Sequence, residues 1–318
     1  MSFSLQVKDE LVQVPPKCKS CLKAMLSALV KSEGTLKLSG SSKFSVEFVT
    51  DNARIARFAL QNFRELYNLE AVLTFRRNIL HNNNNYLIEL LQGPNLIKAL
   101  LDLGIIVLVD KDNKKSFRIA SGIKNEFIEK DCCGSSYLRG AFLANGYVSE
   151  PHPKIPYHFE IKVERKSQAE DMKKILQKKG IKSGVCARRN AYILYIKSGQ
   201  GITDFMAYTG ADKCALDLHN SMLIKQSANH ANRQTNADMA NSKRSTDAAF
   251  SQLLMIEKVA KYYGLENIPP AIRQFMKLRV DHQDASLSEL GEYADPPLSK
   301  SAISGRLRRL TQLAKEIE

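Results

Sequence analysis

The first 210 residues repeat one order of predicted helices and strands. In each copy an apolar helix ends at a glycine, and a strand with alternating apolar and polar positions follows. A helix, two strands and a last helix complete the copy, so both copies have the order αβαββα. The first copy is predicted as a helix ending at 34, a strand at 43–50, a helix at 52–68, strands near 71–76 and 86–91, and a helix near 95–103. The second is predicted as a helix ending at 146, a strand at 157–163, a helix at 167–179, strands near 183–187 and 191–197, and a helix near 202–208.

Two landmarks have the same offset between the copies. Gly34 and Gly146 are 112 positions apart, and so are Arg76-Arg77-Asn78 and Arg188-Arg189-Asn190, each predicted in the turn between the last two strands. Matching landmarks and matching elements indicate a tandem duplication. We therefore predict an α+β fold in which residues 1–213 form a pseudo-dimer of units 1–112 and 113–213. The Asn82–Asn85 run is interpreted as a solvated loop inserted in the first hairpin.

The helices that end at these glycines carry small residues at i, i+4 spacing. Ala28 and Ser32 lie on one face of the first helix, and Gly140 and Ala144 lie on one face of the second. Such faces allow two helix backbones to approach closely. The glycine that follows each helix suits the left-handed conformation that ends many helices.

Both segments resemble the LAGLIDADG helix of the homing endonucleases, and the second matches it at Leu138, Gly140, Ala144 and Gly146. The resemblance implies that the two helices pack as the interface between the units, and that each sheet forms half of a saddle over DNA. For either segment alone, an ordinary amphipathic core helix is the alternative. The duplication favours the LAGLIDADG arrangement.

The last position of each motif helix decides whether a nuclease is expected. In the resembling enzymes this position is acidic in both helices, and the two carboxylates bind divalent metal ions that support phosphodiester hydrolysis. Here Glu33 keeps the first acid, but Asn145 occupies the second position. An amide coordinates metal weakly, and the pair loses one negative charge. We predict no catalytic residues, with Glu33 and Asn145 as vestigial positions, and no enzyme activity.

Composition favours a polyanionic partner. The chain of 318 residues has 47 Lys and Arg against 33 Asp and Glu, a formal charge of +14, and nucleic acid is the first candidate for its partner. With 44% hydrophobic residues the chain can form ordinary cores, and no apolar run reaches the length of a membrane span. We therefore expect a cytosolic, basic protein without a membrane partner.

Four of the six cysteines precede the two motif helices. Cys18 and Cys21 form a C-x-x-C before the first, and the adjacent Cys132 and Cys133 stand before the second. A four-thiolate zinc site is one interpretation, but adjacent cysteines rarely bind one metal together. We predict packing thiols in a reducing compartment, with no metal and no cofactor.

Basic residues outside the last helix are candidates for secondary DNA contacts. They are Arg76, Arg77, Arg188 and Arg189 in the hairpin turns, Lys162 on a strand, and Arg233 and Lys243 further on. The arginine pairs could equally be solvated turn residues. Arg233 and Lys243 belong to an asparagine-rich stretch of a long helix predicted over 217–264. This stretch is interpreted as a solvated linker within residues 214–264, or as a surface that reads phosphates or docks onto the front domain.

Residues 265–318 contain a helix-turn-helix pattern. Pro269-Pro270 marks a boundary before a short helix at 271–280. Ser286 and Glu289 form a capping box for a helix at 287–293, and Ser299 caps a helix that extends to about residue 316. In this last helix the apolar stripe is Ile303, Leu307, Leu310 and Ala314. Between Ser299 and Lys315 the charged residues are all basic, as expected of a recognition helix in the major groove.

A second resemblance spans nearly the whole chain. The segments Ser288-Glu289-Leu290-Gly291, Pro297-Leu298-Ser299-Lys300-Ser301 and Arg306-Leu307-Arg308-Arg309 are similar to the C-terminal motif of the WhiA family of bacterial sporulation and cell-division regulators. The asparagine-rich stretch and the segment Tyr137–Gly146 resemble the same family. That family combines a degenerate LAGLIDADG domain with a helix-turn-helix. One departure is Ser304-Gly305, where the family implies Asn-His; glycine within a helix costs about 1 kcal/mol relative to alanine.

The sequence is therefore interpreted as a sequence-specific DNA-binding transcription regulator. The resemblance implies a role in cell division, chromosome segregation and, in sporulating species, sporulation, at the nucleoid. The expected DNA contacts are Ser299, Lys300, Ser301, Ser304, Arg306, Arg308 and Arg309. The N-terminal domain would offer a surface to double-stranded DNA or to a protein partner. The alternatives are an active homing endonuclease or RNA maturase, and a protein-docking module whose basic charge is incidental.

Overall fold

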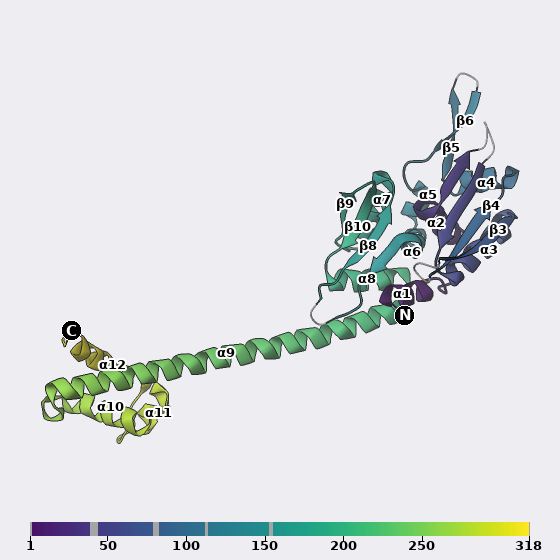
Figure 1. The fold of residues 1–318 in the computed structure, drawn as a ribbon. Coiled ribbons are helices and arrows are strands. Elements are labelled where there is room, and N and C mark those ends of the chain that lie inside the picture. The colour runs from purple at the N-terminus through teal and green to yellow at the C-terminus, as the bar shows by residue number, and fades with distance from the viewer. Residues whose placement is uncertain (1, 39–43, 79–82, 112–113, 153–154, 318) are drawn as a thin grey trace. The chain divides into compact units, whose positions relative to one another are not determined.

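Two repeats of one αββαββα order form most of the first compact unit, which comprises Met1–Lys225 (Figure 1). The computed structural model describes residues 2–38, 44–78, 83–111, 114–152 and 155–317. The first repeat consists of α2 (Lys19–Glu33), β1 (Thr35–Leu38), β2 (Phe44–Thr50), α3 (Ala53–Tyr67), β3 (Ala71–Asn78), β4 (Asn83–Leu90) and α4 (Pro94–Asp102). The second consists of α6 (Asp131–Asn145), β7 (Gly146–Val148), β8 (Phe159–Val163), α7 (Lys166–Lys178), β9 (Gly184–Arg188), β10 (Ala191–Ile196) and α8 (Gly199–Thr209).

The two sheets have the same topology. Their strand orders are β1-β2-β4-β3 and β7-β8-β10-β9, and every neighbouring pair is antiparallel. Each strand of the first sheet thus has a counterpart at the same place in the second. The predicted α+β duplication is confirmed.

The ends of α2 and α6 differ from the prediction. Each helix passes directly into a short strand that the αβαββα order omitted, β1 or β7. Gly34 and Gly146 are extended, with φ of −79° and −82°, so the expected left-handed conformation was wrong. Glycine is needed for another reason. A Cβ would overlap the carbonyl oxygen of Val30 at Gly34, and that of Phe142 at Gly146, because the chain turns back against the last helical turn.

The arginine and asparagine positions of the first hairpin also differ from the prediction. Arg76 and Arg77 lie within β3 rather than in a turn, and they pair with Asn85 and Asn84 of β4. Three of the four asparagines of the 82–85 run thus extend the strand instead of forming a loop, while Asn82 lies outside the described residues. Backbone pairing across the hairpin stabilises this extended part of the sheet.

The core of the first unit is centred on α2 and α6, which lie between the two sheets (Figure 1). Both helices are buried on nearly every side; α6 is buried continuously from Cys133 to Leu143. A helix covered all round belongs to the centre of a domain rather than to its surface. The phenylalanines Phe142, Phe159 and Phe205 join α6 to β8 and α8 through ring contacts.

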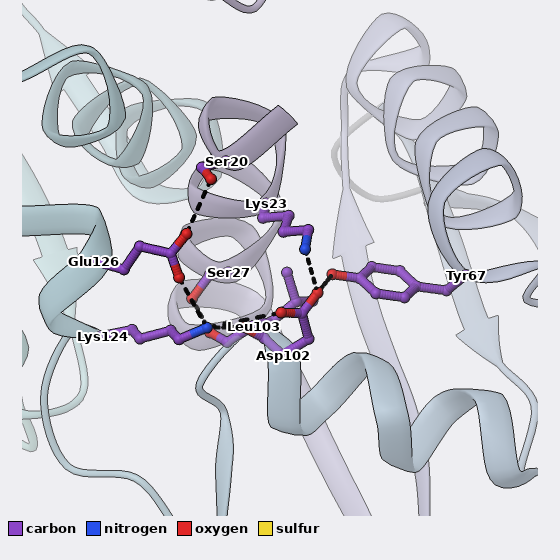
Figure 2. Close-up of polar contacts among 8 residues, drawn as sticks. All are labelled: Ser20, Lys23, Ser27, Tyr67, Asp102, Leu103, Lys124 and Glu126. Atoms are coloured by element: carbon purple, nitrogen blue, oxygen red, sulfur yellow. Dashed lines mark hydrogen bonds and ion pairs between the residues drawn. The ribbon is translucent and has the colours of Figure 1, made fainter. Parts of the chain in front are cut away.

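A polar brace fixes α2 against the rest of the first repeat (Figure 2). The carboxylate of Asp102, at the end of α4, accepts a 2.8 Å hydrogen bond from the Tyr67 hydroxyl and lies 2.7 Å from Nζ of Lys23 on α2. Lys124 Nζ lies 3.1 Å from Glu126, which accepts a hydrogen bond from Ser20. Partial burial alone would raise the pKa of Asp102, but the hydrogen bonds from Lys23 and Tyr67 outweigh it and hold that pKa below its ordinary value.

Besides β1 and β7, four elements of the first unit were not predicted. They are α1 (Phe3–Leu11), the hairpin of β5 (Ile106–Lys111) and β6 (Lys114–Ile119), and α5 (Asn125–Glu129). α1 is held to the second repeat, because Ser4 Oγ donates to the Val148 carbonyl and Lys8 Nζ donates to the Ala144 carbonyl.

The second compact unit, Gln226–Glu318, is entirely helical in its described part. It contains the later part of α9 (Asp212–Tyr263), a 3-10 turn (Leu265–Asn267), α10 (Pro270–Asp281), α11 (Leu287–Glu292) and α12 (Lys300–Lys315). Its core comprises Ile256, Val259, Ile272, Phe275, Leu290, Ile303 and Leu310, with a few neighbours. Among the helices in the described residues, α9 included, none combines the length and the apolar character needed to cross a bilayer.

Candidate nucleic-acid interface

The two motif helices approach through the small residues that the sequence indicated. A Cβ at Gly140 would overlap the carbonyl oxygen of Met25 and would lie 3.0 Å from Cβ of Ala28. Ser32 is buried, and its hydroxyl accepts a 3.2 Å hydrogen bond from the Gln168 side chain. Gly140 therefore lies where α6 approaches the backbone of α2 too closely for a larger side chain.

The ends of the two helices bring Glu33 and Asn145 together. The Asn145 amide donates a 2.8 Å hydrogen bond to the Ser32 carbonyl, which ties the two helix ends. Burial raises the pKa of Glu33 to about 7, although the charges of Lys8 and Lys162 and a hydrogen bond from Asn145 work against that rise. Burial also lowers the pKa of Lys8. The helix ends, which hold two carboxylates in a cleaving enzyme, thus supply one carboxyl and one amide, with Lys8, Lys162 and Asp51 close enough to act on Glu33 electrostatically.

The raised pKa of Glu33 gives a testable pH dependence. An unfolded glutamate has a pKa of about 4.3, so the folded chain binds more protons between about pH 4.3 and pH 7. The free energy of unfolding therefore falls as pH rises through this window. We expect Glu33→Gln, which keeps the shape of the neutral acid, to stabilise the protein by about 1–2 kcal/mol at about pH 8, after allowing for its partial exposure, and by less at about pH 5.

Urea unfolding of the wild-type protein and the Glu33→Gln variant at both pH values measures this difference. Glu150→Gln, at an exposed position, is the matched control and should change stability little at either pH. A gain for Glu33→Gln that is the same at both pH values would contradict the assignment.

The outer face of the second sheet carries basic residues beside an acidic one. Lys162 and Arg188 are exposed on the face that the strand pairing assigns to Glu160, away from α6. Arg188 lies 3.7 Å from the Glu160 carboxylate. Arg189 is exposed in the β9–β10 turn with a φ of 53°. Part of the positive charge on this face is therefore already paired.

The outer face of the first sheet is also mixed in charge. Arg76 is exposed there, and the backbone of Arg77 occupies the next position of β3. Glu47 and Glu89 pair across β2 and β4 on the same face, and Lys37 forms an ion pair with Glu47. In the described residues, the outer faces of both sheets thus carry acidic as well as basic side chains.

The helix-turn-helix geometry is set by caps and by one glycine. Ser286 and Glu289 form the predicted capping box of α11, and the Ser299 side chain accepts from the Ala302 amide at the start of α12. A Cβ at Gly291 would overlap the Leu298 carbonyl oxygen, and the Leu298 amide donates to the Gly291 carbonyl at 2.8 Å. The segment that connects α11 to α12 therefore packs directly against α11 at Gly291.

α12 presents most of the predicted contact residues to solvent. Lys300, Ser301, Arg308 and Arg309 are exposed, whereas Ser304 is half-buried. The Ser301 hydroxyl lies 2.9 Å from that of the capping residue Ser299. Arg306 is half-buried and donates a 2.8 Å hydrogen bond to Gln274 of α10, so it also holds α12 in place. Arg233 and Lys243 are exposed on α9.

One residue that positions the helix-turn-helix, Arg279, was not predicted from the sequence. It is 2% exposed, and its guanidinium donates to Gln252 Oε1 of α9 and to the carbonyls of His282, Gln283 and Ala285 ahead of α11. Arg279 therefore positions the first helix of the helix-turn-helix. In the sequence it is one of several basic residues, and nothing in the pattern marks it as buried.

Side chains that could bind a metal ion cluster away from Glu33 and Asn145. Within the described part of the chain, a suitable cluster is formed by Cys18, Cys21, Cys132 and Cys133, at the opposite ends of α2 and α6 from Glu33 and Asn145.

The architecture defines a class of protein: two LAGLIDADG-like αβ repeats followed by a helical helix-turn-helix domain. Three family models match in that order. They describe the WhiA N-terminal LAGLIDADG-like domain at residues 19–106, the WhiA LAGLIDADG-like domain at 134–227 and the WhiA C-terminal HTH domain at 231–314. The chain belongs to the WhiA family.

Relatives and a solved structure agree with this assignment. The chain is 36% identical over 315 residues to the "Probable cell division protein WhiA" of Alkaliphilus metalliredigens, covering 99% of this chain and 98% of the relative. It is 36% identical over 318 residues to the protein of that name from Desulforudis audaxviator, covering 100% and 98%. The crystal structure of full-length WhiA from Thermatoga maritima, 23% identical, covers 99% of both chains with a TM-score of 0.59, which shows the shared fold.

Proposed function

We propose that the protein is a sequence-specific regulator of transcription that binds double-stranded DNA through its helix-turn-helix. The observation that carries this proposal is α12, a capped helix whose apolar stripe is buried and whose exposed charged residues are basic. Such a helix enters the major groove with its first residues at the base edges. The matched HTH domain of the family supports this interpretation.

The residues of α12 divide into two roles. Lys300, Ser301 and Ser304 lie at its start and would read base edges. Arg308 and Arg309 lie further along and would bind phosphates, which position the protein without selecting sequence. Arg306 would share its guanidinium between Gln274 and a phosphate. Ser299 would act as the helix cap that fixes these positions.

The remaining parts of the chain would support this role. The division we propose is a degenerate LAGLIDADG-like domain at 1–213, a linker helix region at 214–264 and the DNA-binding domain at 265–318. The mixed charge of the sheet faces suits a protein partner or weak DNA contacts through Arg76, Arg77, Arg188 and Arg189. Arg233 and Lys243, exposed on α9, could add phosphate contacts.

The biological setting we propose follows from the relatives. Their printed names concern cell division, so we propose regulation of genes for cell division and chromosome segregation, and of sporulation in species that sporulate. The protein would act in the cytoplasm on the nucleoid. Selection of bound fragments from genomic DNA with the full-length protein tests the proposal: an enriched motif is expected, and its absence would contradict sequence-specific binding.

Cleavage of DNA is not expected. A metal-dependent LAGLIDADG nuclease needs two acidic ligands at the helix ends, and here Asn145 faces Glu33. The selected duplex should stay intact on incubation with Mg²⁺ or Mn²⁺ and the full-length protein. Specific strand scission that is lost in Glu33→Gln would establish the homing-endonuclease alternative instead.

A further inference from the structure

Four cysteine sulfurs converge where α2 and α6 begin. The Sγ atoms of Cys18, Cys21, Cys132 and Cys133 all lie within 4.8 Å of one another. Sγ of Cys18 is 3.3 Å from that of Cys21 and 3.9 Å from that of Cys133, and the Cys21–Cys133 distance is 4.0 Å. Two segments separated by more than one hundred residues thus supply the cluster.

The duplication explains why these thiols meet. Cys21 and Cys133 are 112 positions apart, the offset that relates Gly34 to Gly146, so they are equivalent residues of the two repeats. Because α2 and α6 lie side by side and both begin near the cluster, their equivalent first turns come together. Cys18 and Cys132 have Lys130 and Ser20 at the equivalent positions, so each repeat adds one cysteine of its own.

The separations fit a single tetrahedral metal ion. A zinc–thiolate bond of about 2.3 Å places the four sulfurs of a tetrahedral site about 3.8 Å apart. The measured distances bracket this value, and only small side-chain movements are needed to equalise them. All four corners are filled by protein sulfur, which is the composition of a structural rather than a catalytic zinc site.

Positively charged groups and two helix N-termini lie around the cluster. Cys18 caps α2, while Cys132 and Cys133 lie in the first turn of α6, so the partial positive charges of two helix N-termini face the sulfurs. Lys17, Lys19 and Lys130 adjoin the cluster in sequence, and the buried Arg139 guanidinium interacts electrostatically with Cys21. Arg139 would offset part of the negative charge of a zinc tetrathiolate, whereas Asp131 beside Cys132 would add to it. Cys21 and Cys133 are buried and Cys18 is exposed, which leaves a route for the ion.

We propose that Cys18, Cys21, Cys132 and Cys133 bind one zinc ion, which clamps the beginnings of α2 and α6 and so fixes the interface between the two repeats. The ion would be structural and independent of DNA binding by α12. Adjacent Cys132 and Cys133 can both be ligands because the first helical turn directs both side chains toward the start of α2, as the converging sulfurs show.

Metal analysis of the full-length protein tests the site. We expect about one zinc per chain after purification under reducing conditions, and cobalt substitution should give the intense absorption of tetrahedral cobalt thiolate. Cys21→Ser should reduce the bound zinc at least tenfold. Cys186→Ser, which alters an exposed thiol on β9, is the matched control and should retain the ion.

A second variant keeps the test decisive if the first one does not fold. If Cys21→Ser fails to fold, Cys18→Ser at the exposed corner should fold and bind zinc more weakly, and chelation should make three cluster thiols reactive instead of the four of the wild-type protein. Reduced protein that takes up no zinc on reconstitution would overturn the proposal. So would a Cys18–Cys21 disulfide that persists in reductant, or equal zinc content in the cluster variants and the Cys186→Ser control.

Discussion

Gly140→Ala is expected to destabilise the first unit by about 3 kcal/mol, because the added methyl group would overlap the Met25 carbonyl oxygen of the neighbouring helix. Moving either helix away would disrupt other packing contacts and cost free energy, since both helices are buried on nearly every side. Gly140→Leu should prevent the two repeats from packing. Urea unfolding of the full-length protein, followed by circular dichroism, measures the loss.

Gly305→Ala provides a control of opposite sign. Gly305 lies within α12, and a Cβ there would meet no described atom within 4 Å. The same chemical change should therefore stabilise its helix by about 0.5–1 kcal/mol. A neutral effect of Gly140→Ala would show that α2 and α6 do not approach at that residue and would contradict the proposed interface.

Arg279→Met is expected to disorder the helix-turn-helix, with a loss of about 3 kcal/mol or more. Methionine fills a similar volume but makes none of the hydrogen bonds to Gln252, His282, Gln283 and Ala285. The buried Gln252 acceptor left without a partner costs about 1–3 kcal/mol, and the hydrogen bonds of the charged guanidinium to the three part-buried carbonyls are worth about 1.5–3 kcal/mol each. Hydrogen exchange of amides in α10, α11 and α12 of the full-length protein measures the effect.

Arg273→Met on the same helix is the matched control. Arg273 is exposed and donates to the carbonyls of Glu266 and Ile268, so its loss should cost less than about 1 kcal/mol. Equal protection of the three helices in both variants would show that Arg279 does not hold the motif together.

The sequence predicted the parts of the fold that have periodic patterns or marked ends. The shared offset of two landmarks, Gly34/Gly146 and the Arg-Arg-Asn pair, together with the matching order of elements, indicated the duplication, and Ser286 and Ser299 located α11 and α12 through capping chemistry. β1 and β7 were missed because each follows its helix without turn residues and has only four or three residues. Strands this short show too little alternation to be distinguished from the end of a helix.

For the candidate sites, the sequence could not predict which side chains contact one another. The sequence does not show which charged side chains form ion pairs. The arginines of the sheets were therefore interpreted as a basic surface, whereas in the structure Arg188 lies 3.7 Å from the Glu160 carboxylate. Burial of Arg279 depends on the packing of α9 against α10. The cysteine cluster depends on the parallel approach of α2 and α6, which spacing rules for two C-x-x-C pairs do not describe.

Two double variants distinguish sequence recognition by α12 from sequence recognition by the sheet faces. The full-length protein would be titrated onto its selected duplex and a scrambled duplex across a salt series. The first variant combines Lys300→Ala with Ser301→Ala at the start of α12, and the second combines Arg188→Ala with Arg189→Ala at the β9–β10 hairpin. Arg309→Ala should weaken binding to both duplexes alike and lower the salt slope by about 1.

The ratio of the two affinities, selected over scrambled, is the measurement that tests sequence recognition by α12 most directly. Each lost base contact is worth about 1–3 kcal/mol of discrimination, so the Lys300/Ser301 variant should lose about tenfold or more of this ratio while the Arg188/Arg189 variant keeps it. If the α12 variant kept the full ratio and the hairpin variant lost it, sequence recognition would belong to the LAGLIDADG-like domain, and the central claim would be wrong.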